Sequence, residues 1–214
     1  MNVKLVAITE PYIKGIESAE ELIAYCARVS NPSNQLNTET APRLLRYCIR
    51  HGHWSVFETV SMTVEIETSR AIATQLLRHR SFTFQEFSQR YAFAAMVEEV
   101  ELRTQDTKNR QGSGDVIEDS GLNNTLSNAL VASMYAYNLL ISEGVSKETA
   151  RMVLPLCTQT TLYMTGNVRS WIHYFEQRCA EHTQKEHRDV ANAVRDIFNK
   201  NFPTVAEALK EAQP

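Results

Sequence analysis

The chain has 214 residues, of which 43% are hydrophobic and 22% charged, and its formal net charge is −3. This composition is that of an ordinary globular protein and argues against a general nucleic-acid binder, which is normally basic. No apolar run approaches the roughly 20 residues that cross a bilayer, and the first residues lack the apolar core of a secretory signal, so we expect a cytoplasmic protein without a membrane partner.

The hydrophobic periodicity predicts regular elements along the first half of the chain. Strands are expected at 3–9 and 60–69, and helices at about 18–30, 40–51 and 70–80. Ser18 and Glu21 form a capping box at the first helix, and Ser69 can cap the third. The alternation over 60–69 predicts a strand with one wet face.

The second half predicts more helix than strand. Strands are expected at 96–104 and 158–166, and helices at about 121–143, 168–181, 184–200 and 204–212, with a short helix ending at Pro155. An apolar stripe follows the 121–143 helix, and the polar, glycine-containing segment 105–120 predicts an exposed, mobile loop. The lack of βαβ alternation favours an α+β fold, and we expect one domain over residues 1–214.

The stretch 78–91, RHRSFTFQEFSQRY, is expected to begin in the last turn of a helix and continue as a loop. It places three arginines and His79 around a single acid, Glu86. Arginine's planar fork suits phosphate or carboxylate, and the interleaved phenylalanines favour a partly buried pocket for a planar phosphorylated ligand. The alternative is a solvated loop, because arginines at a helix C-terminus also stabilise the helix dipole.

Three other groups have a functional and a structural interpretation. His51 and His53, followed by Glu58, could be metal ligands, but alternate histidines share a face only on a strand, and no third ligand is obvious. We therefore favour a loop of hydrogen-bonding groups that includes Ser55 and Glu58, and predict no metal. Cys157 lacks a neighbouring base, which favours a buried structural thiol over a nucleophile.

Asn167, Arg169 and His173 lie at the start of a predicted helix, where unpaired N–H groups attract anions. The alternative is a set of exposed polar residues. His182 and His187 are five residues apart, which is wrong for one helix face, and we expect both on the surface.

Several blocks together resemble the flavin-dependent thymidylate synthases. Arg78-His79-Arg80, followed after seven residues by Ser88, resembles that family's signature. HGHWSVFE at 51–58, ARMVLPL at 150–156 and NVRSWIHYFEQRCAEHTQKE at 167–186 resemble its other blocks in the same order. The likeness runs from about residue 20 to residue 210 and diverges over 103–120.

This resemblance implies a homotetramer of α+β subunits, each with a mostly antiparallel sheet and flanking helices, and active sites shared between subunits. It implies methylation of dUMP to dTMP, with methylenetetrahydrofolate as carbon donor, FAD reduced by NADPH as hydride source, and no cysteine nucleophile. Arg178 would polarise the uracil ring. Glu86 would orient the arginines around it.

The implied cofactor contacts are His53, Ser55, Glu58, Arg78, His79, Arg80, Glu86, Asn167, Arg169 and His173. The implied dUMP contacts are Gln75, Arg78, Glu86, Ser88, Gln89, Arg90, Arg151 and Arg178, with Arg151 arriving from a neighbouring subunit. His173 stands where some relatives have Asn, and only the backbone of Gln89 is expected to take part.

Two other functions fit parts of this pattern. A non-catalytic nucleotide-binding protein would use the same arginines to hold a phosphorylated ligand. An RNA-binding module would use arginine and phenylalanine together, although the net negative charge of the chain argues against it.

Overall fold

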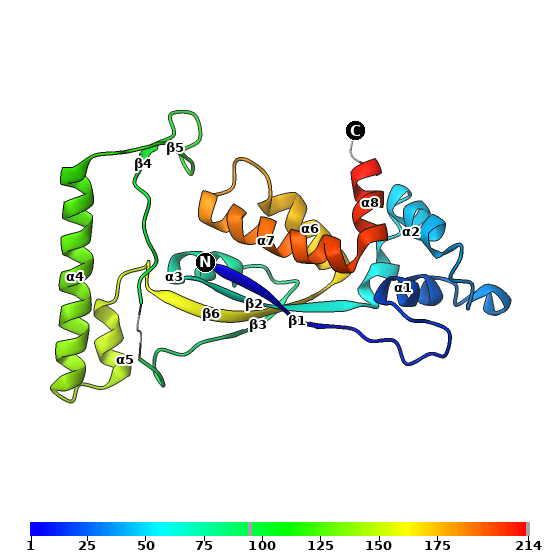
Figure 1. Ribbon diagram of the computed structural model, residues 1–214, viewed down its shortest axis with the longest axis horizontal. Coiled ribbons are helices and arrows are strands. Elements are labelled where there is room, and N and C mark those ends of the chain that lie inside the picture. Colours follow the sequence, from blue (N-terminus) through cyan, green and yellow to red (C-terminus); the bar gives the residue numbers. More distant parts are fainter. Residues whose placement is uncertain (94–95, 213–214) are drawn as a thin grey trace.

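The computed structural model describes residues 1–93 and 96–212 (Figure 1). The strands are β1 (Asn2–Ile8), β2 (Ser61–Ser69), β3 (Thr83–Glu86), β4 (Arg103–Gln105), β5 (Ser113–Val116) and β6 (Gln159–Asn167). The α-helices are α1 (Ala19–Ala27), α2 (Ala41–Arg50), α3 (Arg70–Leu76), α4 (Ser120–Ser142), α5 (Lys147–Ala150), α6 (Val168–Arg178), α7 (Lys185–Asn201) and α8 (Pro203–Ala212). The 3₁₀ turns of the described residues are η1 (Pro32–Asn34), η2 (Trp54–Glu58) and η3 (Arg151–Val153).

The main sheet has the order β1-β2-β6-β3, and every neighbouring pair is antiparallel. Alternate residues of β2 point to opposite faces, so Met62, Val64 and Ile66 are buried. The other face is polar, with Glu65 accepting a hydrogen bond of 2.9 Å from the hydroxyl of Tyr163. The α+β class and the strand with one wet face are therefore confirmed.

Helices α6 and α7 cover the apolar face of the sheet (Figure 1). Trp171 of α6 is fully buried, and its indole N–H donates to the Met62 carbonyl at 3.2 Å. The ring of Phe82 lies directly against Gly166 of β6, where an added Cβ would come within 2.4 Å of a ring carbon. Glycine is required at position 166 because the Phe82 ring occupies the space that a side chain would need.

The predicted capping box of α1 is present, and Ser69 caps α3 as expected. Helix α3 ends at Leu76, however, so the stretch 78–91 begins after the helix rather than in its last turn. Residues 83–86 are not loop, because they pair with β6 as the edge strand β3.

The predicted strand at 96–104 is wrong for most of its length. Val97 makes a single bridge to Thr158, and regular strand begins only at Arg103. The segment predicted as a loop at 105–120 is mostly exposed but contains β5, which pairs with β4 as a hairpin. In the described part of the chain, no helix is both long and apolar enough to cross a membrane.

Helix α4 stands at one end of the molecule, away from the sheet (Figure 1). With α5 and η3 it forms what we call the arm, residues 120–153, and its main packing partners are those two elements. Tyr137 is the one α4 residue that is buried, whereas Val131 and Tyr135 are 64% and 67% exposed. The predicted apolar stripe is covered in part: Tyr137 is buried, Leu126, Leu130, Met134 and Ile141 are half-buried, and Leu122 is exposed, while Val131 and Tyr135 form a second, uncovered apolar surface beside it.

Candidate active site

A pocket of about 570 Å³ opens at the start of α6. Its lining residues are Trp54, Glu58, Ser81, Asn167, Arg169, Ser170, Ile172, His173 and Glu176. Asn167 is the N-cap of α6, and its side-chain oxygen accepts from the Ser170 N–H at 2.8 Å. Four residues predicted to contact a cofactor, Glu58, Asn167, Arg169 and His173, are thus brought together.

Polar groups of this pocket are held in place by side-chain pairs. Arg169 forms an ion pair with Glu58 of η2, and His173 shares a hydrogen bond of 2.9 Å with Gln177, one turn further along α6. A helix N-terminus with an arginine suits an anionic group, and the aromatic and aliphatic lining suits a planar ring. The volume lies in the range of about 300–1,000 Å³ that small-molecule and cofactor sites occupy.

The second group centres on His79 and Arg178. The Arg178 Nε donates to His79 Nε2 at 2.9 Å, so His79 carries its proton on Nδ1. Burial and the positive charge of Arg178 lower the pKa of His79 to about 4. His79 is therefore neutral near pH 7, and the net charge of 78–90 is that of three arginines and one glutamate.

His187 lies beside this pair and was predicted wrongly as a surface residue. It is fully buried, with its ring centroid 6.0 Å from that of His79 and 5.9 Å from that of Tyr174. Its Nδ1 bonds the side-chain oxygen of Gln75 at 3.1 Å. Burial first, and then the charge of Arg178, lower the pKa of His187 to about 3. The other member of the predicted pair, His182, is exposed as expected.

Glu86 does not orient the arginines of its own stretch, which corrects the prediction. Its carboxylate pairs with Arg70 of α3 at 2.8 Å and accepts from the Thr160 hydroxyl at 3.1 Å. Arg78 and Arg80 are exposed, and neither has an ion pair within residues 1–93 and 96–212. Their charges therefore remain available to an anionic ligand.

The remaining predicted substrate contacts lie near α5. Arg90 approaches the Glu148 carboxylate at 3.7 Å, and the Nε of Arg151 donates to the Glu148 carbonyl at 3.4 Å. Ser88 accepts from the Arg90 N–H at 3.4 Å, and Gln89 is buried. Across the described residues, no hydrogen bond or ion pair joins Arg151 to Arg178.

His53 and Ser55 lie at the start of η2, outside the pocket lining. His53 precedes η2, and its ring is 5.7 Å from that of Tyr47. Ser55 is exposed. The described residues contain no group of three or more histidine, cysteine or acidic side chains arranged to hold a metal ion.

Cys157 is partly buried, and burial raises the pKa of its thiol. A raised pKa disfavours the thiolate, as expected for a structural rather than a nucleophilic cysteine.

Sequence reasoning missed several residues that build these sites. Among them are Trp54, Ser81, Arg70, Gln184 and His187. Ser81 directly follows the Arg-His-Arg stretch and Trp54 follows His53, so their neighbourhood was a usable signal. Arg70 and His187 meet their partners only through the fold.

Comparison with known proteins gives a consistent result. Residues 12–204 match the Thy1 family, described as thymidylate synthase complementing protein. A probable flavin-dependent thymidylate synthase of Paramecium bursaria Chlorella virus 1 is 54% identical over 98% of this chain and 99% of its own length. A flavin-dependent thymidylate synthase of Synechocystis is 52% identical over 98% of this chain and all of its own length.

The fold is also that of a solved structure. The UMP/dUMP methylase PolB from Streptomyces cacaoi, bound with 5-Br dUMP, superposes with a TM-score of 0.82. It is 27% identical in sequence, and the superposition covers 98% of this chain and 94% of that one. The sequence relatives and the shared fold agree with the contact between His79 of the Arg-His-Arg stretch and Arg178 of α6. This chain is an enzyme of the Thy1 family, the flavin-dependent thymidylate synthases.

Proposed function

We propose that this enzyme methylates dUMP to dTMP, with methylenetetrahydrofolate as carbon donor and FAD, reduced by NADPH, as hydride source. The names of its relatives and the dUMP methylase with the same fold support this reaction. The observation that carries it is the 2.9 Å hydrogen bond between Arg178 and His79, because it joins two distant sequence blocks at one point.

Arg178 is the residue that we propose acts on the uracil ring. Its Nε is occupied by His79, while its two terminal amino groups have no hydrogen-bond partner within the described residues. Fixed donors of this kind stabilise negative charge that develops on a ring oxygen during reaction. Neutral His79 holds the guanidinium in place without competing for that charge. Activation of uracil would then need no cysteine nucleophile.

The pocket at the start of α6 is the site that we propose for the flavin. Glu58, Asn167, Arg169 and His173 would hold it there, and FAD, when bound, supplies a hydride. The remaining proposed contacts to the cofactor are His53, Ser55, Arg78, His79, Arg80 and Glu86. The proposed contacts to dUMP are Gln75, Arg78, Glu86, Ser88, Gln89, Arg90, Arg151 and Arg178.

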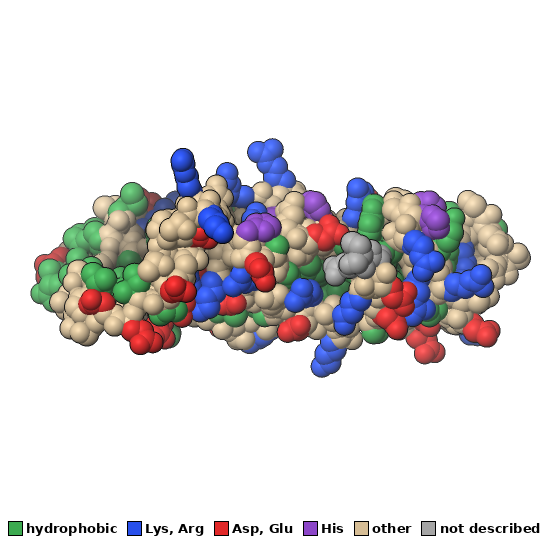
Figure 2. Space-filling view, turned by 90° about the horizontal axis from the view of Figure 1, so that it is seen from above, with side chains coloured by type: hydrophobic (Ala, Val, Ile, Leu, Met, Phe, Trp, Pro, Cys, Tyr) green, Lys and Arg blue, Asp and Glu red, His purple; other side chains and the backbone are tan. Residues whose placement is uncertain are grey.

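We also propose that the enzyme works as a cytoplasmic homotetramer with shared active sites. The arm supports assembly, since Val131 and Tyr135 of α4 are exposed and the α4 end of the molecule carries hydrophobic surface (Figure 2). Large exposed apolar patches on a folded protein mark interaction surfaces. A neighbouring subunit would also explain how Arg151 joins a site whose other residues lie elsewhere in its own chain.

The absorbance spectrum of the purified enzyme, recorded anaerobically with NADPH and then with dUMP and methylenetetrahydrofolate, tests the reaction. We expect a flavin spectrum that NADPH bleaches, followed by dTMP detected by chromatography. Arg178→Ala should lose at least about 100-fold in dTMP formation, as removal of a charge-stabilising donor does elsewhere, and should keep its flavin.

Arg43→Ala is the matched control, because Arg43 is an exposed arginine on α2 outside both site groups. It should retain full activity. A protein that binds dUMP and FAD but whose flavin is never bleached by NADPH would instead be a nucleotide-binding protein without catalysis.

A further inference from the structure

The hairpin of β4 and β5 is tied to the start of α7 by a cluster of four charged side chains. Arg103 contacts Glu101 at 3.0 Å and Glu186 in a second ion pair, and Lys185 reaches Glu101 at 3.0 Å. The Arg103 side chain is only 11% exposed, so its guanidinium depends on these partners. The reaction proposed above assigns no role to this cluster.

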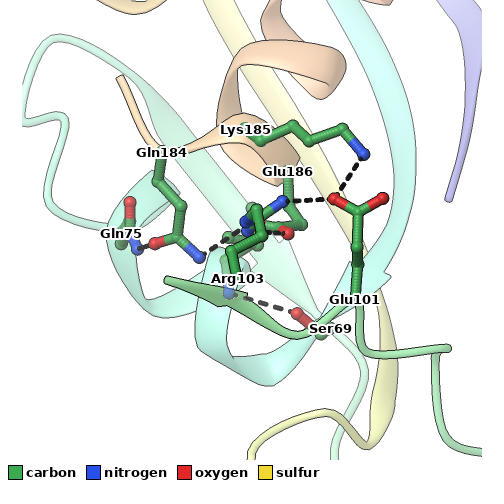
Figure 3. A network of polar contacts seen from close by, with 8 residues as sticks. Ser69, Gln75, Glu101, Arg103, Gln184, Lys185 and Glu186 are labelled. Carbon is green, nitrogen blue, oxygen red and sulfur yellow. Dashed lines mark hydrogen bonds and ion pairs between the residues drawn. The ribbon is translucent and has the colours of Figure 1, made fainter. Parts of the chain in front are cut away.

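A row of hydrogen bonds runs from this cluster toward the proposed substrate site (Figure 3). The Gln184 amide N–H donates to Glu186 at 2.9 Å, and the Gln75 amide N–H donates to the Gln184 side-chain oxygen at 2.7 Å. The Gln75 side-chain oxygen in turn meets His187 Nδ1 at 3.1 Å. The row therefore ends beside His79 and Arg178.

The chemistry of these groups fixes the direction of every bond in the row. An ionised carboxylate only accepts hydrogen bonds, so Gln184 must turn its NH₂ toward Glu186 and its oxygen toward Gln75. Gln75 must then present its NH₂ to Gln184 and its oxygen to His187. His187 is left with one possible arrangement, a proton on Nδ1 and a free lone pair on Nε2.

Arg103 keeps Glu186, the first residue of the row, ionised, and this direction of hydrogen bonding requires an ionised carboxylate there. Burial raises the pKa of Glu186, but hydrogen bonds from its own backbone, Gln184 and Arg103 outweigh it, and the pKa lies below its ordinary value. Without Arg103, this half-buried carboxylate would bind a proton more readily. Loss of the ion pair also leaves the Glu186 side chain without the partner that fixes its position, so the amide row is no longer held in one direction.

We propose that Arg103 is a positioning residue, which acts through Glu186 and Gln184 to fix the orientation of the Gln75 amide and the tautomer of His187. The proposal rests on the proposed function in one respect, namely that Gln75 contacts dUMP. The β4–β5 hairpin, which lies outside the main sheet, thereby sets which end of the Gln75 amide faces the proposed substrate site.

The tautomer is measured first, in ligand-free protein labelled with ¹⁵N-histidine. Long-range ¹H–¹⁵N correlation spectra distinguish the two ring nitrogens, and loss of one signal set in His187→Gln assigns the residue. We expect the proton on Nδ1 in the wild type, a shift toward Nε2–H in Arg103→Gln, and recovery of Nδ1–H in Arg103→Lys. Arg110→Gln is the matched control, since Arg110 lies in the same hairpin with an exposed side chain.

Kinetics then test the connection to substrate. Arg103→Gln should raise the KM for dUMP by about five- to tenfold, the effect of one misdirected hydrogen bond, while kcat changes less. Gln184→Ala breaks the row at an exposed position that should not affect folding, and it should raise KM to the same degree. Both effects should be absent in Arg110→Gln.

Two results would overturn the proposal: His187 protonated on Nε2 in the wild type, or a tautomer and a dUMP KM that are unchanged in Arg103→Gln, whatever Gln184→Ala does. Its failure is distinct from failure of the proposed function. If the wild type forms no dTMP, the proposed function is wrong, and the histidine spectra still test the row of hydrogen bonds by itself.

Discussion

The sheet core and the arm differ in what covers their hydrophobic side chains. In the core, β2, β6, α6 and α7 cover one another, and residues such as Trp171 and Val64 are fully buried within a single chain. In the arm, α4 has 23 residues, yet only Tyr137 is buried. This helix packs mainly against α5 and η3, so exposed residues such as Val131 and Tyr135 are left uncovered by the described part of the chain.

The largest effect that would test this comparison is expected from the core. Trp171→Ala removes a fully buried ring and the hydrogen bond to Met62, and should lower the free energy of unfolding by about 3–5 kcal/mol. Urea unfolding at one fixed protein concentration measures it. A loss below about 1 kcal/mol would mean that the core is not the stable part of the molecule.

A smaller loss is expected where the core is already full. In Gly166→Ala the new methyl group would lie within 2.4 Å of the Phe82 ring, which must move. Overpacking of this kind costs about 1–3 kcal/mol. The double variant Gly166→Ala with Phe82→Leu should lose less than the sum of the two single variants, and strict additivity would contradict the contact.

His187, which is buried, and His79, which is half-buried, predict how the stability of the core responds to acid. The folded pKa of His187 is about 3 and that of His79 about 4, both below the ordinary value of 6.5. Between the folded pKa values and 6.5, the unfolded chain binds more protons than the folded chain does. The stability that the two neutral histidines contribute is therefore fully present above about pH 6.5 and is lost as pH falls toward the folded pKa values. The slope amounts to about 1.4 kcal/mol per pH unit for each proton.

The comparison of two histidine variants isolates this effect. In His187→Gln, the free energy of unfolding should fall less steeply between pH 6 and pH 4. The slope should be smaller by up to the contribution of one proton, about 1.4 kcal/mol per pH unit. His182→Gln, at the exposed position, should leave the slope of the wild type. Equal slopes in both variants would contradict the burial of His187.

The smallest effect on the chain's own stability is expected in the arm. Tyr135→Ala, at a position 67% exposed, should change the free energy of unfolding of the isolated chain by less than about 0.5 kcal/mol. If a second copy covers α4, the same change weakens assembly, which sedimentation velocity over a range of protein concentrations detects. An unchanged sedimentation profile would remove α4 from the assembly surface.

Local patterns in the sequence predicted local structure well. The capping box at Ser18, the alternation of β2 and the polar groups at the start of α6 each depend on neighbouring residues, and each is present. The grouping of Asn167, Arg169 and His173 in one pocket follows from their spacing on a single helix.

The errors arose where the outcome depended on distant parts of the chain. His187 seemed exposed because its spacing from His182 was judged on one helix, but α7 begins at Lys185 and His182 lies outside it. The partner of Glu86 is Arg70, sixteen residues away on another element, which no local pattern indicates. On α4, periodicity identified apolar positions but not how deeply each is buried, because only Tyr137 is fully covered.

The pairing of Glu86 with Arg70 has a consequence for the kinetics of binding. Because the one acid of the 78–90 stretch is engaged by a residue outside it, Arg78 and Arg80 project a positive potential into solvent. Such a field attracts a phosphate dianion over about one Debye length, roughly 10 Å at 0.1 M salt. The association rate of a nucleotide should therefore fall as ionic strength rises, while its dissociation rate changes much less.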